Sequence, residues 1–457
     1  MSNADLDAKV IALDRAREAA EARPPEFADD ALALLFAERH KDSLRYVAAL
    51  GRWLMFDGVR WRFDETLAAR DLARKICREA SSRCNKKMAK TIASAKTVAA
   101  VERLAQSDRR IAATVEQFDA DPWLLNTPAG IVDLRSGDVR RHDARAYLTK
   151  ITGVAPDDAC PTPAWCAFLE RIMGDDVIEY LRRVAGYSLT GSTQEHALFF
   201  CYGLGANGKT TFLNAITGCA GDYHRAAPIE TFTASSHDQH PTDLAGLRGA
   251  RLVTAIETEE GRRWAESRIK SLTGGDKIAA RFMRQDFFEY TPQFKLIIAG
   301  NHKPGLRSVD EAIRRRFNLI PFGVTIPPDE RDQQIGDKLK AEWPGILAWM
   351  IDGCIAWQQD GLRTPEAVLA ATAAYLNAED AIAAWLEEAG ERDLNAWEKS
   401  NDLFASWVAW ATKAGEYIGT QKRFSQNLET RGLTFERRGY GRGFRGLRLS
   451  AAGYGTR

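Results

Sequence analysis

The chain lacks a long hydrophobic run. No stretch of about 18 apolar residues, the length at which a helix begins to span a bilayer, occurs anywhere in the sequence. The first residues alternate charged side chains with alanine and contain no apolar segment of the signal-peptide type. We therefore expect a cytoplasmic protein that has no membrane partner.

Cysteine is scarce and irregularly placed. Seven cysteines are scattered over 457 residues, and no two of them have the Cys-x-x-Cys spacing that zinc sites usually need. An odd number of dispersed thiols indicates reduced side chains that mostly fill space. The cysteine pattern therefore argues against a zinc site and against a fold held together by disulfide bonds.

Excess charge of either sign is also missing. The 63 Lys and Arg residues almost balance the 62 Asp and Glu residues, for a formal net charge of +1. Contact with nucleic acid must then come from local basic patches and not from a global field. Basic helices are predicted over residues 70–83 and 86–104, and from residue 421 onward nine cations stand against two carboxylates.

Apolar residues are plentiful, at 45% of the chain, and the length suits about three domains of roughly 100 to 200 residues. The pattern predicts a helix over 4–22, a helix over 31–38, and hairpins that turn at Asp57-Gly58 and Ser136-Gly137. Helices follow over 164–187. Between 194 and 322 short apolar runs alternate with helical segments, which predicts an α/β core with a mostly parallel sheet. Helices are expected again through 359 and over 365–394.

The most specific motif is a glycine-rich loop between an apolar run and a helical segment. Residues 203–210 read Gly-Leu-Gly-Ala-Asn-Gly-Lys-Thr, which matches the G-x4-G-K-[ST] pattern of a P-loop. Such a loop wraps its backbone N–H groups around phosphates, its lysine reaches the β- and γ-phosphates, and its hydroxyl can ligate Mg²⁺. The predicted ATP contacts are Gly203, Gly205, Ala206, Asn207, Gly208, Lys209, Thr210 and Thr211, with Thr210 as a Mg²⁺ ligand.

Two further apolar runs end in polar residues that suit ATP hydrolysis. The run 251–256 leads into Glu257 and Glu259, which we take as the metal-binding and water-activating pair, with Glu257 as the second Mg²⁺ ligand. The run 294–300 ends at Asn301, whose amide can bind the γ-phosphate or orient the attacking water. The alternative for the two glutamates is a solvated acidic turn, and the alternative for Asn301 is a polar cap at the end of the strand.

Three consecutive arginines precede another apolar run. Arg314, Arg315 and Arg316 lie where an arginine finger could be offered to the nucleotide of a neighbouring subunit. A basic helix end stabilised by the helix dipole is the alternative.

The C-terminal segment reads as helix, helix and then a glycine-tipped basic hairpin. This order is typical of a winged helix. Its candidate DNA contacts are Lys422, Arg423, Arg437, Arg438 and Arg442. A solvated basic tail is the alternative.

Taken in order, these motifs resemble superfamily 3 helicases, and in detail the phage/plasmid primase-helicase family related to the poxvirus primase-helicase. The resemblance rests on 203–210, 257–259, 274–284, 301–304 and 314–316, and on 53–61 and 121–134, which resemble that family's pre-helicase domain. It implies an AAA+-like P-loop ATPase that forms a ring, usually a hexamer, with ATP between subunits and DNA in the central channel.

The resemblance also implies roles for particular residues. Arg316 would be the finger, with Arg315 as the fallback, Asn301 the polar sensor, and Lys270 a cation near the neighbouring nucleotide. A hairpin before the sensor strand would follow DNA through Arg281, Phe282 and Arg284. Thr258 separates the two acids, whereas papillomavirus and parvovirus helicases have adjacent acids, so the division of labour between Glu257 and Glu259 stays open.

The expected organisation has six parts. They are an N-terminal helical arm (1–29), a pre-helicase domain (30–160), a helical collar or linker (161–193), the ATPase core (194–325), a helical lid region (326–395) and a basic winged-helix-like domain (396–457). Only about 30 residues precede the pre-helicase segment, so we expect no primase domain in this chain.

The leading hypothesis is an ATP- and Mg²⁺-dependent DNA helicase that acts on single-stranded and forked DNA as a homohexamer. It would serve phage, prophage or plasmid replication in a bacterial cytoplasm, with a separate primase or polymerase as a possible partner. The alternatives are an origin-binding or loading ATPase without sustained unwinding, and an RNA-directed or defence ATPase.

Overall fold

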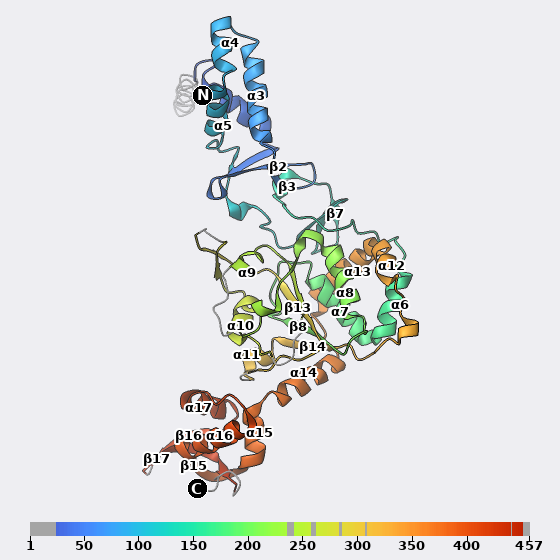
Figure 1. Ribbon diagram of the computed structural model, residues 1–457, viewed down its shortest axis with the longest axis vertical. Helices are drawn as coiled ribbons and strands as arrows, with labels where there is room; N and C mark the ends of the chain where they lie inside the picture. The colour runs from blue at the N-terminus through green and yellow to red at the C-terminus, as the bar shows by residue number, and fades with distance from the viewer. Residues whose placement is uncertain are drawn as a thin grey trace, which may run out of the picture. The chain divides into compact units, whose positions relative to one another are not determined.

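The computed structural model describes residues 24–234, 242–256, 262–282, 286–306, 309–439 and 441–450 (Figure 1). The chain divides into two compact units. The first comprises residues up to 133 together with 138–151, and the second comprises 134–137 together with 152–457. The helix predicted over 4–22 lies outside the described residues.

The described part of the first unit contains four α-helices and two small sheets. Its helices are α2 (Asp29–His40), α3 (Ala68–Ser81), α4 (Lys86–Ile92) and α5 (Ala95–Ala105). One sheet has the order β3-β2-β1-β4, from β1 (Leu44–Val47), β2 (Arg52–Phe56), β3 (Trp61–Phe63) and β4 (Ala112–Ala113). The other has the order β5-β6-β7, from β5 (Leu124–Thr127), β6 (Gly130–Asp133) and β7 (Val139–Arg140). The helices α2, α3 and α5 each bury one face in a common core, through Phe36, Ile76 and Val101 respectively.

Both predicted hairpins are confirmed. Val132 pairs with Val139 across the turn that holds Ser136 and Gly137. Phe56 pairs with Trp61 across the turn that holds Asp57 and Gly58, and the Asp57 carboxylate accepts the N–H of Val59 at 2.9 Å. Gly58 adopts φ +99°, a left-handed conformation that glycine enters without steric cost. The single helix expected over 86–104 is instead two helices. The first ends at Ile92, and Ser94 caps the second by accepting the Thr97 N–H at 3.2 Å.

The second unit is built on a five-stranded sheet whose neighbouring strands all run parallel. Its order is β14-β8-β13-β10-β9, from β8 (Leu198–Tyr202), β9 (His224–Ala226), β10 (Leu252–Ile256), β13 (Lys295–Gly300) and β14 (Phe317–Pro321). The strands β8, β10 and β13 are buried nearly throughout, as expected of a parallel sheet covered on both faces. The predicted mixed α/β fold with a parallel sheet is confirmed.

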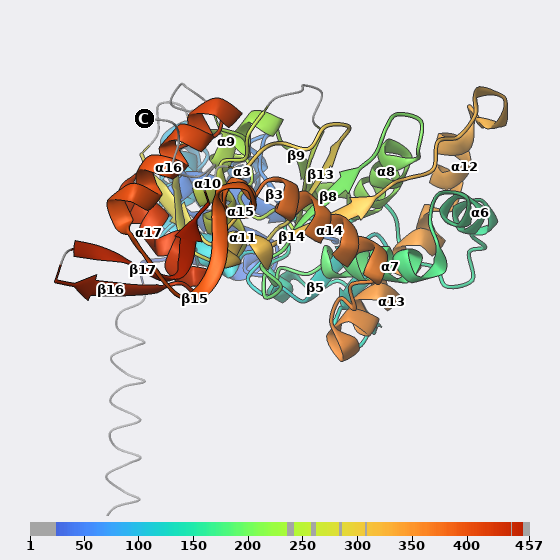
Figure 2. The same cartoon turned by 90° about the horizontal axis from the view of Figure 1, so that it is seen from below.

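Helices and one hairpin surround this sheet. They are α6 (Pro163–Ile172), α7 (Asp175–Tyr187), α8 (Lys209–Ala220), α9 (Thr242–Ala245), α10 (Glu266–Gly274), α11 (Glu311–Arg314), α12 (Ile335–Ala341), α13 (Trp343–Asp360) and α14 (Glu366–Ala378). The hairpin pairs β11 (Ile278–Ala280) with β12 (Phe288–Tyr290). Figure 2 shows α14 beside β14, where the Leu319 N–H donates to the Thr372 hydroxyl at 2.9 Å.

The helices α7 and α13 approach each other unusually closely. A Cβ added to Gly186 would lie 2.1 Å from the Cys354 nitrogen, and one added to Gly353 would lie 2.1 Å from the Arg182 carbonyl oxygen. Any larger residue at either position would push the helices apart. The two glycines therefore fix the crossing of α7 and α13.

The last part of the unit has its own core. Its elements are α15 (Ala381–Ala389), β15 (Gly390–Lys399), α16 (Ser400–Ala414), α17 (Gln421–Thr430), β16 (Thr434–Arg438) and β17 (Gly441–Leu449), and its sheet has the order β15-β17-β16. Trp385, Leu403, Phe424 and Phe444 are buried together.

The prediction of helix through 394 is wrong beyond Ala389. Residues 390–399 form β15, because Gly390 pairs with Leu449 and the following residues pair along β17. This pairing over a long sequence distance outweighs the local helical tendency of the segment. In the described part of the chain, no helix is both long enough and apolar enough to cross a membrane.

Candidate active site

The glycine-rich loop lies between β8 and α8, as the motif predicts. It covers Gly203 to Gly208, and Lys209 is the first residue of α8. Ala206 and Gly208 have positive φ values of +59° and +86°, so the backbone curls tightly before the helix begins. A Cβ on Gly203 would lie 2.2 Å from the Phe322 carbonyl oxygen, whereas a Cβ on Gly205 would meet nothing within 4 Å. The loop is therefore closed against the end of β14 on one side and open above Gly205.

Lys209 is held inside this loop. It is only 6% exposed, and its ammonium donates to the Gly203 carbonyl, to the Asn207 side chain at 3.0 Å and to the Asn301 side chain at 3.2 Å. Asn207 is itself fixed, because its amide donates to the Phe322 carbonyl at 3.1 Å. Burial lowers the pKa of Lys209, with a smaller opposing effect from Cys201.

The carboxyl ends of three strands meet beside the loop. Gly300 pairs with Tyr202, and Ile256 pairs with Ala299, so β8, β13 and β10 end at the same edge of the sheet. Asn301 follows β13 and is exposed there, which brings the predicted sensor to within hydrogen-bond distance of Lys209. Ile256 is the last described residue of β10. Glu257 and Glu259 lie outside the described residues, so their placement stays a prediction.

The predicted metal ligand on the loop is accessible. Thr210 is exposed and Thr211 is half-buried at the start of α8. Among the described residues, no group of three or more His, Cys, Asp or Glu side chains is arranged to hold a metal ion.

The three arginines lie at the opposite edge of the sheet. Arg316 immediately precedes β14, and its carbonyl accepts the N–H of Leu198, the first residue of β8. A five-residue strand therefore separates these arginines from the loop, a distance of roughly 13 Å or more along the strand. The predicted catalytic residues that the structure describes thus fall into two groups, at the carboxyl and the amino ends of the strands.

The neighbouring arginines differ sharply in environment. Arg316 is 6% exposed, and its guanidinium donates to the Thr273 hydroxyl at 3.1 Å and to the Ala312 carbonyl at 2.8 Å. Arg315 is exposed. Arg314 pairs with Asp380 at 3.1 Å. Of the three, Arg315 therefore has its side chain available for an outside partner.

Lys270 lies with the arginine group. It projects from α10 and pairs at 2.5 Å with Asp310, the residue that caps α11 by accepting the Ile313 N–H. Burial opposes ionisation of Asp310, but hydrogen bonds from Lys270 and Ile313 hold the pKa of its carboxyl below the usual value. The sequence predicts the cation, but Asp310 was missed as its partner.

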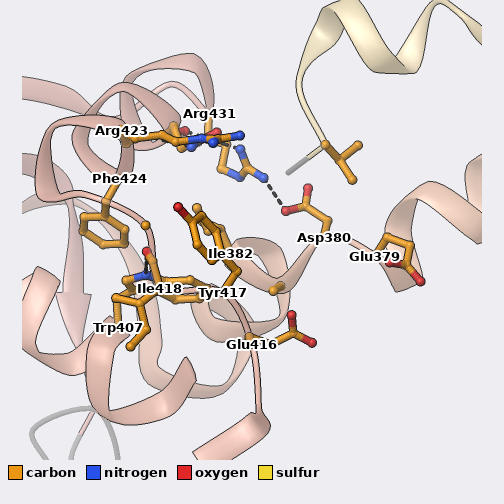
Figure 3. Close-up of a pocket in the computed structure, with 14 residues that line it drawn as sticks. Glu379, Asp380, Ile382, Trp407, Glu416, Tyr417, Ile418, Arg423, Phe424 and Arg431 are labelled. Carbon is orange, nitrogen blue, oxygen red and sulfur yellow. Dashed lines mark hydrogen bonds and ion pairs between the residues drawn. The ribbon is translucent and has the colours of Figure 1, made fainter. Parts of the chain in front are cut away.

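A pocket beside α11 is lined by the C-terminal core. Figure 3 shows Asp380 bonded to Arg431 there, with Trp407, Tyr417 and Phe424 around it. A neighbouring cleft of about 410 Å³ continues past Asp310 and Arg314. Both of these cavities adjoin the arginine group.

Asp380 is a residue that the sequence reasoning missed. It is 6% exposed, it binds both Arg314 and Arg431, and it caps α15 by accepting the Ala383 N–H at 3.2 Å. Its position directly before a helix was the available signal. One carboxylate therefore ties the arginine helix α11 to the C-terminal core.

We expect the substitution Asp380→Asn to destabilise the C-terminal core. The amide removes the charge that compensates two guanidinium groups, and breaking a buried ion pair typically costs about 3–5 kcal/mol. Thermal unfolding followed by tryptophan fluorescence should report the loss, because Trp385 and Trp407 lie in this core. Asp393→Asn is the matched control, since its exposed partner Arg448 at 3.3 Å should contribute at most about 1 kcal/mol. Equal unfolding temperatures for the Asp380 variant and the wild type would contradict the prediction.

The hairpin predicted before the sensor strand is present. β11 and β12 pair antiparallel, and Arg281, Phe282 and Phe287 lie at its tip with the two aromatic rings 41% and 61% exposed. The Arg281 guanidinium stacks over Phe287 at 4.7 Å, and Phe282 stacks on Phe288. Arg284 lies outside the described residues.

The predicted C-terminal DNA contacts divide between two elements. Lys422 and Arg423 are exposed on α17, where Arg423 lies 3.8 Å from Glu266. Arg437 and Arg442 are exposed on the β16–β17 hairpin, whereas Arg438 pairs with Glu436 at 3.1 Å.

Comparison with known proteins adds two family matches. Residues 33–174 match the family described as D5 N terminal like. Residues 201–316 match a family of unknown function, DUF5906. The second range runs from the end of β8 through the three arginines.

Curated relatives bear the name "Putative helicase". One, from Acanthamoeba polyphaga mimivirus, is 27% identical over 215 residues, covering 46% of this chain and 22% of the relative. Another, from Frog virus 3 (isolate Goorha), is 26% identical over 341 residues, covering 69% of this chain and 33% of the relative. This chain thus spans a third or less of the length of these two proteins.

Solved structures share the fold. The apo structure of the NrS-1 C terminal region (305-718) superposes with a TM-score of 0.52 at 10% identity, over 94% of this chain and 100% of the other. A second apo form of the same region superposes with a TM-score of 0.50 at 9% identity, over 92% of this chain and 99% of the other. The family matches and the viral relatives confirm the resemblance to the primase-helicase family, and the solved structures show that the fold is shared.

Proposed function

We propose that this relative of the viral helicases is an ATP-dependent DNA helicase that works as a ring, with ATP hydrolysed at the interfaces between subunits. The observation that carries the proposal is the buried Lys209 ammonium, held by Gly203, Asn207 and Asn301 at the carboxyl edge of a parallel sheet. Ligands of open α/β sheets bind at this edge, and the start of a helix favours phosphate.

Residues of the loop would divide the work of holding ATP. The backbone N–H groups of 203–208 would surround the phosphates, and Lys209 would move from the Gly203 carbonyl to the β- and γ-phosphates. Thr210 and Glu257 would hold Mg²⁺, which neutralises charge on the transferring phosphoryl group when it is bound. Asn301 would orient the attacking water, and Glu257 or Glu259 would accept its proton.

The separation of the two residue groups supports a site shared between subunits. Arg315 lies at the amino edge of the sheet, a strand's length away from the loop, so it would serve the nucleotide of a neighbouring subunit. Exposure favours Arg315 over Arg316 as the finger, because Arg316 is already bonded within its own chain. Lys270 would approach the same neighbouring nucleotide. A closed ring, with a hexamer as the expected size, places every finger beside a loop.

DNA would contact two regions of the second unit. The hairpin tip offers Arg281, Phe282 and Arg284 for phosphates and bases, and stacking on an aromatic side chain is tolerant of sequence. The C-terminal core would act as a winged helix through Lys422, Arg423, Arg437, Arg438 and Arg442. Its element order, helix, strand, two helices and a hairpin, supports that assignment.

The domain boundaries remain those expected from the sequence, with one change. The arm (1–29), the pre-helicase domain (30–160), the collar (161–193) and the ATPase core (194–325) are kept. The lid region would end near 380, and the winged-helix domain would begin there and not at 396, because Trp385 and Ala389 belong to its core. Replication of a phage, prophage or plasmid in a bacterial cytoplasm, with a separate primase or polymerase, is the proposed setting.

Strand displacement on a forked DNA, with ATP and Mg²⁺, tests this function. The protein should displace the strand as a ring of defined native mass, and Lys209→Ala should not. A ring whose ATPase is stimulated by DNA but which displaces nothing would favour a loading ATPase. Stimulation by RNA greater than that by DNA would favour the RNA-directed alternative.

A further inference from the structure

The first unit carries a basic surface that the proposed ATPase and its DNA contacts leave unused. Between Arg70 and Lys96 the sequence holds nine cations and two carboxylates, a net charge of +7 in a chain whose total is +1. The segment forms α3, α4 and the start of α5. We call this surface the α3–α4 tip, and within the first unit it lies on the side away from β2 and β3 (Figure 1).

The cations of the tip point away from the core of the unit. On α3, the buried residues Ala73, Ile76 and Cys77 pack inward, while Arg74 and Arg78 are exposed one turn apart. On α4, Ile92 is buried, and three lysines lie on the exposed surface. The exposed cations of the tip are Arg70, Arg74, Lys75, Arg78, Arg83, Lys86, Lys87, Lys90 and Lys96.

Carboxylates compensate only part of this charge. Asp71 pairs with Lys75 at 3.1 Å and lies 3.8 Å from Arg74, and Glu102 lies 3.8 Å from Arg70. Glu79, the second carboxylate of the segment, is bonded to Arg39 outside it. Six cations of the tip make no ion pair with any residue that the structure describes: Arg78, Arg83, Lys86, Lys87, Lys90 and Lys96.

We propose that the α3–α4 tip is a second nucleic-acid-binding surface, which holds the phosphate backbone independently of nucleotide and of base sequence. Six unpaired cations on one surface repel each other unless anions lie against them, and a nucleic-acid strand supplies closely spaced anions. One turn of helix separates Arg74 from Arg78 by about 6 Å along the axis, which is close to the roughly 7 Å of two nucleotide steps.

The composition of the surface favours nucleic acid over a lipid bilayer. A helix that lies on a membrane presents a broad apolar face between its cations. The apolar face of α3 is buried in the protein core, and Met88 is the one large apolar side chain of α3 and α4 that is exposed, at 43%. The choice of DNA as the probe rests on the proposed helicase function.

The test is equilibrium binding of the full chain to labelled forked DNA, without ATP, over a range of salt concentrations. The variant is the triple substitution Lys86→Gln, Lys87→Gln and Lys90→Gln. It should bind about tenfold or more weakly at low salt, and the slope of log K against log salt should fall by roughly 2 to 3, near 0.7–0.9 per lost phosphate contact. Glutamine is a good helix former, so α4 should persist.

The control is the triple substitution Arg140→Gln, Arg141→Gln and Arg145→Gln. These three arginines are also exposed in the first unit, so the change in charge is the same, but they lie outside the tip. Equal unfolding temperatures for the wild type and both triple variants would establish that binding is compared between folded proteins. A reduced slope for the lysine variant alone supports the proposal.

Two results would overturn it. One is that the lysine variant has the same slope of log K against log salt as the wild type. The other is unchanged DNA binding together with loss of binding to anionic phosphatidylserine vesicles, which would assign the tip to a membrane. Failure of the ATPase proposal is separate, because Lys209→Ala leaves the tip intact and the assay contains no ATP.

Discussion

Replacing Lys209 by alanine should abolish ATP hydrolysis. The change removes a cation that is only 6% exposed and therefore weakly screened by water, from the place where the β- and γ-phosphates would lie. Loss of a single preorganised donor to a developing charge typically costs about 10² to 10³ in kcat, so turnover should fall by at least that factor. Release of phosphate at saturating ATP and Mg²⁺ measures it.

The control for this variant must separate lost chemistry from lost structure. Lys209 also bonds Gly203, Asn207 and Asn301, so the unfolding temperature should be compared with that of the wild type. Lys338→Ala is the matched control, because that lysine is exposed and pairs with Asp332 at 2.6 Å far from the loop in sequence. A folded Lys209→Ala protein with near wild-type turnover would contradict the assignment of the phosphate site.

The loop could be predicted because the sequence pattern that defines it lies within one short segment. A strand, a glycine-rich turn and a helix start occur within fifteen residues, and Gly203 and Gly208 have the close contact and the positive φ that explain glycine there. The mostly parallel sheet was also predicted, and its observed register lets β8, β10 and β13 end at one edge. The confirmed parallel sheet thus brings Asn301 to Lys209, as the motif order indicates.

The features that escaped prediction depend on contacts between distant segments. Adjacent arginines look equivalent in a sequence, and only the packing of Thr273 and Ala312 around Arg316 separates it from Arg315. Asp380 looks like an ordinary helix cap until Arg314 and Arg431 are seen to meet at it. Likewise, β15 becomes a strand because β17 pairs with it, and no local pattern over 390–399 carries that information.

Replacing Arg315 by alanine should leave ATP binding intact and nearly stop hydrolysis. An arginine finger contributes about 10³ to 10⁵ in kcat, because it stabilises charge on the transferring phosphoryl group rather than the bound nucleotide. The exposed side chain has room to leave without disturbing its own subunit, so the unfolding temperature should not change. Arg316→Ala is the contrasting variant. It leaves the Thr273 hydroxyl and the Ala312 carbonyl without their buried donor, so it should destabilise the protein by roughly 1–3 kcal/mol.

A mixing experiment tests whether the finger acts between subunits. In a random equal mixture of Lys209→Ala and Arg315→Ala subunits, about one interface in four joins an intact Lys209 to an intact Arg315. ATPase activity should therefore return to roughly a quarter of the wild-type level, although each variant alone is inactive. The sheet requires this outcome if Arg315 is the finger, since the loop and the arginine lie at opposite edges within one chain. A mixture no more active than its separate components would remove Arg315 from the shared site.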